Sequence, residues 1–295
     1  MSANDWTDWQ PLPVTLTPAV LAETLDGGQA FRWIKEPDDV WLGIWGENLA
    51  RLSLDPHGSL QWSAPIPLAD KVGHELRKYL GLENDFATQV GSLPWRSDSH
   101  LAMCLEAFPG LRILRQPFGE TLLCFLCSAT KQIVQIKQMT ALLASRHGAE
   151  IAPGYHRLPT WIELANLSEL TLRGCLLGFR ARHIHETATF LVENPDWLSE
   201  TENAPYAEAK ERLCTLPGVG GKVADCALLF GASRLEAFPV DVWILRTMER
   251  HYALTNWKPA QVAQFGRAHF GPLAGLAQQY LFAYERSTSK TQVTE

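Results

Sequence analysis

The sequence has no run of 18 apolar residues, so we expect no membrane-spanning helix. Its N-terminus lacks a basic stretch followed by an apolar one, so we expect no signal peptide. No internal repeat is visible, which excludes a solenoid. Cysteine is scarce and its spacing forms no disulfide framework, so we expect a reducing compartment. The six cysteines stand at positions 104, 124, 127, 175, 214 and 226.

An excess of positive charge is also absent. The 26 lysines and arginines are outnumbered by 32 aspartates and glutamates, which gives a formal net charge of −6. This balance argues mildly against a nucleic-acid partner. It does not exclude one, because a protein that holds one site on a duplex needs a local positive groove rather than a basic average. Binding in such a groove would weaken as salt rises, because phosphate contacts release counterions.

The chain is long enough for one large or two modest domains, and its 46% hydrophobic content can form a core. Up to about residue 65, short runs alternate apolar and polar residues, as in a half-buried antiparallel sheet. These runs include 30–34, 40–45 and 49–54, with a short helical stretch at 19–25. Most later segments have helical periodicity. The sequence therefore predicts an α+β fold, with an N-terminal antiparallel sheet domain followed by an all-α domain.

The most informative stretch runs from Cys214 to Cys226. Residues 216–220 read Leu-Pro-Gly-Val-Gly, which cannot continue a helix. An apolar run then begins a new helix, whose first N–H groups are free to meet a phosphate. The pattern predicts a helix–hairpin–helix element that binds a DNA backbone without reading sequence, with Gly218 and Gly220 as backbone contacts.

A carboxylate follows this element. Pro239 ends the preceding segment, and Asp241 opens a helix predicted over 242–251. Taken alone, Asp241 is most simply an N-cap and Lys222 a solvated lysine on a first helical turn. Their combination changes this interpretation, because Pro-Val-Asp ends 19 residues past a lysine that follows a hairpin.

Together, Leu-Pro-Gly-Val-Gly-x-Lys-Val-Ala-Asp-Cys and Pro-Val-Asp-Val resemble the helix-hairpin-helix-GPD DNA glycosylase superfamily, and within it the 8-oxoguanine DNA glycosylase/AP lyase branch. The resemblance implies a β-rich domain with linking helices over 1–110, a helix-hairpin-helix-GPD catalytic domain over 111–290 and a loose tail over 291–295. It implies that Lys222 is the nucleophile and Asp241 the catalytic carboxylate. The implied activity is excision of 8-oxoguanine from duplex DNA in base excision repair, followed by β-elimination through a Schiff base.

Two further motifs match the positions that form the base pocket in this family. Gly28 lies in Gly-Gln-x-Phe-Arg-Trp, where the family uses a glycine carbonyl to accept the N7–H of 8-oxoguanine. Guanine carries a lone pair there instead, and the unmade buried bond costs about 1–3 kcal/mol. Gln278 and Phe282 lie in Gly-Pro-x-Ala-Gly-x-Ala-Gln-x-x-Leu-Phe, and the resemblance assigns them the Watson–Crick edge and one face of the base. Cys226 would close the other face.

The positions that would contact the opposite strand match less well. Phe179 and Arg180 lie in Gly-Phe-Arg-Ala-Arg, which the resemblance assigns to a wedge and an orphan-base contact. Thr130 and Gln135 stand where the eukaryotic branch has a gap-filling asparagine and a cytosine-reading arginine. Trp243 replaces a phosphate-binding histidine. The preference for cytosine opposite the lesion is therefore open.

The resemblance implies no cofactor and no metal held by side chains. The family hairpin often holds a sodium or potassium ion through backbone carbonyls, for which Cys214, Leu216 and Val219 are the matching positions. The pair Cys124 and Cys127 permits a redox or metal interpretation, but it lies in an apolar helical run without a second pair. The cysteine cluster that carries the iron–sulfur centre of endonuclease III-like relatives is absent.

The resemblance implies that the protein acts on damaged double-stranded DNA. We expect it to be a monomer and to have no contact with a membrane. The implied location is the cytoplasm, near the nucleoid, in a prokaryote, and the nucleus in a eukaryote. Two alternatives remain at this stage. One is an alkylated-base (3-methyladenine-type) glycosylase of the same fold, against which Lys222, Gly28 and Gln278 weigh. The other is a non-catalytic DNA-binding protein, against which the pairing of Lys222 with Asp241 weighs.

Overall fold

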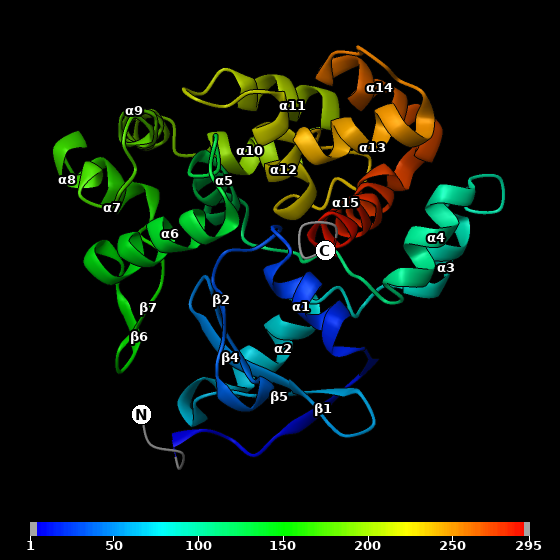
Figure 1. Cartoon of the computed structure of the whole chain (residues 1–295). Coiled ribbons are helices and arrows are strands. Elements are labelled where there is room, and N and C mark those ends of the chain that lie inside the picture. Colours follow the sequence, from blue (N-terminus) through cyan, green and yellow to red (C-terminus); the bar gives the residue numbers. More distant parts are fainter. Residues whose placement is uncertain (1–4, 292–295) are drawn as a thin grey trace.

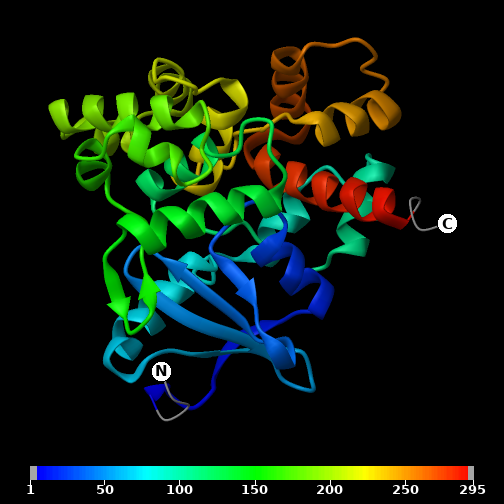
Figure 2. The same cartoon turned by 60° about the vertical axis from the view of Figure 1, so that its left-hand side comes forward.

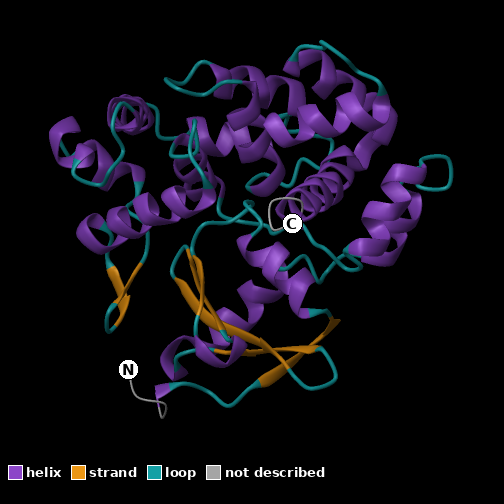
Figure 3. Cartoon of the chain, viewed as in Figure 1, coloured by secondary structure: helices purple, strands orange, loops and turns teal. Residues whose placement is uncertain are grey.

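The computed structural model describes residues 5–291, with side chains to residue 288. Its N-terminal part holds a five-stranded sheet, and helices make up most of the remainder (Figure 1, Figure 3). The strands pair antiparallel in the order β1-β5-β4-β3-β2. The predicted α+β fold class is confirmed. The strands are β1 (Gln10–Thr15), β2 (Trp33–Lys35), β3 (Trp41–Trp45), β4 (Asn48–Leu54) and β5 (Ser59–Ser63).

Both faces of the sheet are covered, which explains why β3 is buried along its whole length. Successive side chains of a strand point to opposite faces. Trp41 and Trp45 join the core formed with α1 (Pro18–Asp26) and α2 (Ala69–Tyr79), whereas Leu42 and Ile44 face the other way. A two-stranded hairpin, β6 (Glu150–Ala152) and β7 (Tyr155–His156), packs on that second face, as Figure 2 shows beside the sheet.

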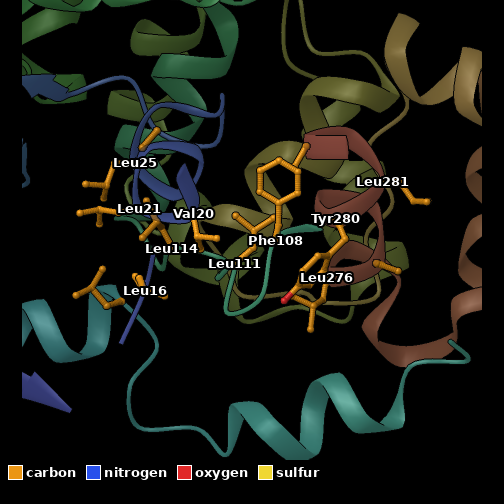
Figure 4. Packing of buried hydrophobic residues seen from close by; sticks show 14 of the residues in the cluster. Leu16, Val20, Leu21, Leu25, Phe108, Leu111, Leu114, Leu276, Tyr280 and Leu281 are labelled. Atoms are coloured by element: carbon orange, nitrogen blue, oxygen red, sulfur yellow. The ribbon is translucent and has the colours of Figure 1, made fainter. Parts of the chain in front are cut away.

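The first core also joins the sheet part to the C-terminal helix. Figure 4 shows Val20, Leu21 and Leu25 of α1 beside Leu111 and Leu114. The same cluster continues to α15 (Ala274–Thr291) through Leu276, Tyr280 and Leu281. The N-terminal part is thus packed against the helix that carries two of the predicted base contacts.

A second core lies between the helices on the other side of the molecule. Its centre is α5 (Phe118–Leu126) packed on α12 (Gly221–Phe230), with α6 (Ile133–His147) and α9 (Arg180–Glu193) around them. The two stacked aromatic rings of Phe125 and Phe230 join these helices, with centroids 5.5 Å apart. The other helices are α3 (Phe86–Ser92), α4 (Ser99–Ala107), α7 (Trp161–Ala165), α8 (Glu169–Arg173), α10 (Trp197–Asn203), α11 (Tyr206–Cys214), α13 (Val242–Tyr252) and α14 (Pro259–Phe270).

One predicted element differs clearly from the structure. The strand expected over 30–34 is reduced to β2, because the chain before it bonds elsewhere. Gln29 accepts a hydrogen bond from the backbone N–H of Leu114 and, through its own carbonyl, one from the Gln116 side chain. At the other end of the chain, α15 continues to Thr291, and residues 292–295 of the expected tail lie outside the described residues. Across residues 5–291, every helix is too short or too polar to cross a membrane.

Candidate active site

The glycine-rich hairpin joins α11 to α12, as the sequence predicts. Gly218 has a φ of +77°, and a Cβ there would lie 2.3 Å from Nδ1 of His183, so only glycine fits. Gly220 is the N-cap of α12, and a Cβ there would meet no described atom within 4 Å. The start of α12 is therefore open to a ligand that approaches its first N–H groups.

A buried ionic network fixes the two helices of this element. Asp225 of α12 is 2% exposed and accepts hydrogen bonds from Tyr206 Oη at 2.7 Å and Lys210 Nζ at 2.8 Å. Arg267 of α14 donates to the same tyrosine oxygen at 3.2 Å. Burial raises the pKa of Asp225, and the charge of Lys210 opposes this. Removing one partner from such a buried network is costly, so the network holds α12 in a fixed position.

Lys222 lies on the first turn of α12 and is half-buried. Its Nζ is 3.4 Å from Oγ of Ser128 and 4.9 Å from the ring centroid of Phe125. The Ser128 hydroxyl donates its one hydrogen to the carbonyl of Phe125 at 2.7 Å, so it can only accept from the amine. This contact leaves the lone pair of a neutral amine available for attack.

Asp241 serves as the N-cap of α13, which is the simpler of its two interpretations. Its Oδ1 accepts from the backbone N–H groups of Trp243 at 3.0 Å and Ile244 at 2.9 Å. Burial raises the pKa of Asp241, while the bond from Ile244 and the charge of Lys222 oppose the shift. The two bonds from Trp243 and Ile244 both engage Oδ1, and neither uses Oδ2 of the same carboxylate. The capping bonds thus orient the carboxylate of Asp241, and they are compatible with a part in the chemistry.

The structure brings the predicted catalytic and base-binding residues to one cavity. Its volume is about 50 Å³. A cavity of about 150 Å³ accommodates benzene, and a purine is larger still. The cavity as it stands is therefore smaller than a base. The cavity is lined by Gly28, Phe125, Lys222, Cys226, Phe230, Pro239, Asp241, Gln278, Gln279 and Phe282.

Gly28 reaches the cavity from the N-terminal part. Its φ is +105°, a conformation that side chains strongly disfavour. The next residue, Gln29, is 1% exposed and donates to the carbonyls of Thr24 at 3.0 Å and Arg112 at 2.8 Å. Together with its bond to Leu114, these contacts fix the backbone beside Gly28. The glycine is thus held rigidly, as selective recognition by a carbonyl requires.

The other base-binding candidates come from α15 and α12. Gln278 is 3% exposed, and its Oε1 accepts from Nε2 of Gln279 at 2.7 Å. The ring of Phe282 has the guanidinium of Arg286 5.8 Å from its centroid. Burial raises the pKa of Cys226 to about 11, against the opposing charge of Lys222, so this thiol is protonated at neutral pH. The cavity therefore presents a glutamine, an aromatic ring and a neutral thiol.

The predicted contacts to the opposite strand lie at the start of α9, in the loop before α6 and on the first turn of α6. Phe179 is 52% exposed, as a wedge requires. Arg180 is only 3% exposed and donates to Oγ1 of Thr130 at 3.1 Å, so it does not project to solvent, as the implied orphan-base contact would require. Gln135 is exposed, and its Oε1 accepts from the backbone of Gln132 at 3.1 Å, which caps α6.

The last predicted contacts are Trp243 of α13 and the carbonyls of the hairpin. Trp243 is half-buried, with the Arg246 guanidinium 5.4 Å from its ring centroid. The Leu216 carbonyl accepts from the Val219 N–H at 3.1 Å, which closes the turn. Carbonyls at the end of α11, including that of Cys214, carry the negative end of the helix dipole and suit a cation. Among residues 5–291, no cluster of histidine, cysteine, aspartate and glutamate has the makings of a metal site.

The cysteine pair at the end of α5 shows no sign of redox or metal chemistry. Cys124 and Cys127 are free thiols, 3% and 0% exposed. Burial raises the pKa of Cys127 to about 12 and that of Cys124 well above its ordinary value. Thiols that stay protonated and buried are inert packing groups.

Besides the lining residues Phe125, Phe230 and Gln279, three supporting residues of the site were not singled out by the sequence. Ser128 contacts the amine of Lys222, Gln29 fixes Gly28, and His183 packs under Gly218. Gln29 lies inside the Gly-Gln-x-Phe-Arg-Trp motif, so the sequence marks this residue but does not show that it fixes Gly28. Ser128 and His183 carry no local signal, because their contacts join segments far apart in the chain.

Comparison with known proteins covers nearly the whole chain. Residues 11–122 match the family model described as the N-terminal domain of 8-oxoguanine DNA glycosylase. Residues 123–269 match the HhH-GPD superfamily of base excision DNA repair proteins. The N-glycosylase/DNA lyase OGG1 of Arabidopsis thaliana is 32% identical over 96% of this chain and 82% of its own length.

Solved structures give the same relation in three dimensions. The 8-oxoguanine glycosylase/lyase of Clostridium acetobutylicum, in complex with double-stranded DNA containing cytosine opposite 8-oxoG, superposes with a TM-score of 0.85. It is 27% identical and covers 97% of this chain and 99% of its own. The 3-methyladenine DNA glycosylase of Archaeoglobus fulgidus has a TM-score of 0.75 at 20% identity over 96% of this chain and 99% of its own, which shows a shared fold alone.

Proposed function

The chain belongs to the 8-oxoguanine DNA glycosylase family of the HhH-GPD superfamily, and from this premise we propose that it excises 8-oxoguanine from duplex DNA and then cleaves the strand as an AP lyase. One observation carries the proposal. The amine of Lys222 and the carboxylate of Asp241 line the same cavity as Gly28, Gln278 and Phe282. That set combines a nucleophile, a charge stabiliser and groups suited to a flipped base.

The chemistry follows from the two central residues. The base must leave the stack before C1′ of its sugar can be attacked. The Lys222 amine forms a bond to C1′ as the C1′–N9 bond breaks, and the base leaves with the electron pair and takes up a proton. The ionised Asp241 stabilises the positive charge that develops on the sugar. The nitrogen of the resulting glycosylamine then loses a proton, and the C1′–O4′ bond breaks as O4′ takes up a proton, which leaves a Schiff base. Loss of a proton from C2′ then expels the 3′ phosphate by β-elimination.

Selection of the lesion rests on Gly28. Its backbone is held by the buried hydrogen bonds of Gln29, so a carbonyl there cannot turn to suit a different base. An N7–H donor of 8-oxoguanine makes a bond with such a carbonyl, whereas guanine places a second acceptor against it. The unmade bond costs about 1–3 kcal/mol, or roughly 5- to 150-fold in the relevant equilibrium. Gln278 and Phe282 add contacts to the edge and face of the base.

Recognition of the opposite base is expected to be looser. Thr130 is a short side chain that already bonds to Arg180, and Gln135 uses its carbonyl oxygen to cap α6. Neither offers the planar fork of an arginine, which bonds bases through two parallel donors. The enzyme should therefore process 8-oxoguanine opposite several bases at comparable rates.

Three further assignments complete the proposal. The protein acts as a monomer on damaged double-stranded DNA, in the cytoplasm near the nucleoid of a prokaryote or in the nucleus of a eukaryote. A sodium or potassium ion at the carbonyls of Cys214, Leu216 and Val219 would orient the hairpin toward a phosphate. Exchange of these ions for choline would then weaken DNA binding at constant ionic strength.

Borohydride trapping tests the function directly. The protein is incubated with duplexes that carry one 8-oxoguanine opposite each of the four bases, beside the variant Lys222→Gln. The expected result is a trapped covalent complex in the wild type that is lost in the variant. Excision without trapping would remove Lys222 as the nucleophile, and no excision at all would contradict the substrate assignment. Duplexes with methylated bases would then test the alkylated-base alternative.

A further inference from the structure

Arg180 occupies an unusual place for a residue beside the duplex gap. It is 3% exposed although its neighbour Phe179 is 52% exposed. One guanidinium nitrogen donates to the carbonyl of Leu177 at 3.2 Å, and the other donates to the carbonyl of Ala129 and, at 3.1 Å, to Oγ1 of Thr130. The side chain therefore bridges the turn before α9 and the loop before α6.

The loop that Arg180 holds is strained. Thr130 has a φ of +56°, a conformation that a β-branched residue rarely adopts and that costs on the order of 1–3 kcal/mol. Such a conformation persists only where the surroundings impose it, and the bonds from Arg180 to both Ala129 and Thr130 do so. The turn on the other side of the bridge is similarly constrained, because Leu176 has a φ of +62°. The arginine thus connects two segments that would relax without it.

The contacts of Arg180 also extend toward the wedge residue Phe179 and the proposed nucleophile Lys222. The guanidinium lies 4.3 Å from the ring centroid of Phe179, close enough to orient that ring by a cation–π contact. At the other end, the loop begins at Ser128, whose hydroxyl lies 3.4 Å from Nζ of Lys222. A continuous series of contacts therefore runs from the exposed wedge to the base pocket.

We infer that Arg180 is a positioning residue that assembles Phe179 and Thr130 into one gap-filling unit before DNA binds, and that it does not read the orphan base. The inference rests on the proposed function and deepens it. Because the unit replaces the extruded base without contacting the opposite base through an arginine, it should act alike opposite all four bases. Its contribution should be greatest when a stacked base has to be extruded, since extrusion costs a few kcal/mol.

The test compares Arg180→Gln with Arg182→Gln. Both changes remove one positive charge from the same helix, but Arg182 is exposed and pairs with Glu186 at the surface. Single-turnover excision is measured with 8-oxoguanine opposite each of the four bases, and strand cleavage is measured on a preformed abasic site. Fluorescence of 2-aminopurine placed beside the lesion reports extrusion of the base. A third variant, Thr130→Val, removes one bond of the bridge and keeps the shape of the side chain.

Arg180→Gln is expected to slow excision and base extrusion by about 10- to 100-fold, by a similar factor opposite every base, and to slow abasic-site cleavage by less than about 3-fold. Thr130→Val should show the same pattern at about 3- to 10-fold and carries the test if Arg180→Gln does not fold. Arg182→Gln should keep the wild-type ratio of excision to abasic cleavage.

Three results would overturn the inference. A loss confined to cytosine would mean that Arg180 reads the opposite base. An equal loss in excision and abasic cleavage would mean that it supports only the fold or Lys222. An identical pattern in Arg182→Gln would mean that charge alone matters. If the wild type itself excises no 8-oxoguanine, the proposed function fails first, and that failure is separate from any difference between the variants.

Discussion

The two sides of the proposed DNA-binding site, the base pocket and the gap that the extruded base would leave, are built differently. On the pocket side, Gly28, Lys222 and Asp241 line one cavity, and buried hydrogen bonds fix the segments that carry them. On the gap side, Phe179 is exposed and Thr130 is held in a strained conformation by Arg180. The pocket must place reacting atoms within fractions of an ångström, so its geometry tolerates little change. The gap has only to be filled, so several side chains can do it.

Among the changes on the pocket side, Asp241→Asn is expected to have the largest effect on the rate of excision. Asparagine is as good an N-cap as aspartate, so α13 should remain folded while the charge near the sugar is lost. Excision of 8-oxoguanine in single-turnover kinetics should fall by about 10²- to 10³-fold.

The control for this change is Asp241→Ala, which also removes the cap. It should lose a comparable amount of activity and, in addition, about 1 kcal/mol of unfolding free energy. If Asp241→Asn excises at nearly the wild-type rate, the carboxylate has a structural role only.

The second effect is expected from Gly28→Ala. The new methyl group would strain a backbone at φ +105° and lie 3.1 Å from Cδ1 of Ile133, so the carbonyl beside the base should shift. Excision should fall by about 10- to 100-fold, because the N7–H bond is weakened, whereas cleavage of an abasic site should change little.

Gly154→Ala is the matched control for backbone strain. Gly154 lies at the tip of the β6–β7 hairpin at φ +82°, and a Cβ there would meet no described atom within 4 Å. This variant should lose stability without losing excision. Equal losses of excision in the two variants would show that strain, rather than base recognition, explains the effect at Gly28.

The difference between the pocket side and the gap side also determines which features the sequence could predict. The hairpin, the cap of α13 and the two strands at β3 and β4 follow from local patterns, because proline, glycine and alternation act within a few residues. The roles proposed for Lys222, Asp241 and Gly28 come from family motifs, and their meeting in one cavity depends on long-range packing that no local pattern contains.

What the sequence could not predict depends on distant contacts. Ser128 meets Lys222 across 94 positions, and Arg180 meets Thr130 across 50. The expected strand at 30–34 was wrong in extent because Gln29 bonds to a segment more than 80 positions away. The orphan-base contact implied for Arg180 requires an exposed side chain, but burial of an arginine depends on carbonyl partners that only the folded chain supplies.

The third prediction changes the residues on the gap side and so tests whether they set the preference for the opposite base. The double variant Thr130→Asn, Gln135→Arg introduces the residues of the eukaryotic branch. Asparagine tolerates a positive φ better than threonine, so the loop should be retained. Excision opposite cytosine should rise relative to excision opposite adenine by about 10-fold, because an arginine donor pair discriminates bases by about 1–3 kcal/mol. An unchanged ratio would place opposite-base selection elsewhere.

The smallest effect concerns stability and lies at the far end of the helix that Asp241 caps. His251 at the end of α13 stacks on His100 of α4, with ring centroids 3.6 Å apart. Burial and the charge of His251 lower the pKa of His100 to about 4. The unfolded chain, with an ordinary histidine pKa near 6.5, therefore binds this proton first as the pH falls. Stability is fully present above about pH 6.5 and declines toward pH 4, by at most about 3 kcal/mol.

Urea unfolding at a series of pH values measures this dependence. His100→Phe keeps a stacked ring and removes the proton site, so its unfolding free energy should vary less between pH 6.5 and 4 than that of the wild type. His57→Phe, at an exposed turn between β4 and β5, should leave the dependence unchanged. Equal slopes for all three proteins would assign acid sensitivity to other groups. A reduced slope in His100→Phe alone would show that the helix that fixes the proposed catalytic carboxylate is anchored by a buried histidine that must stay neutral.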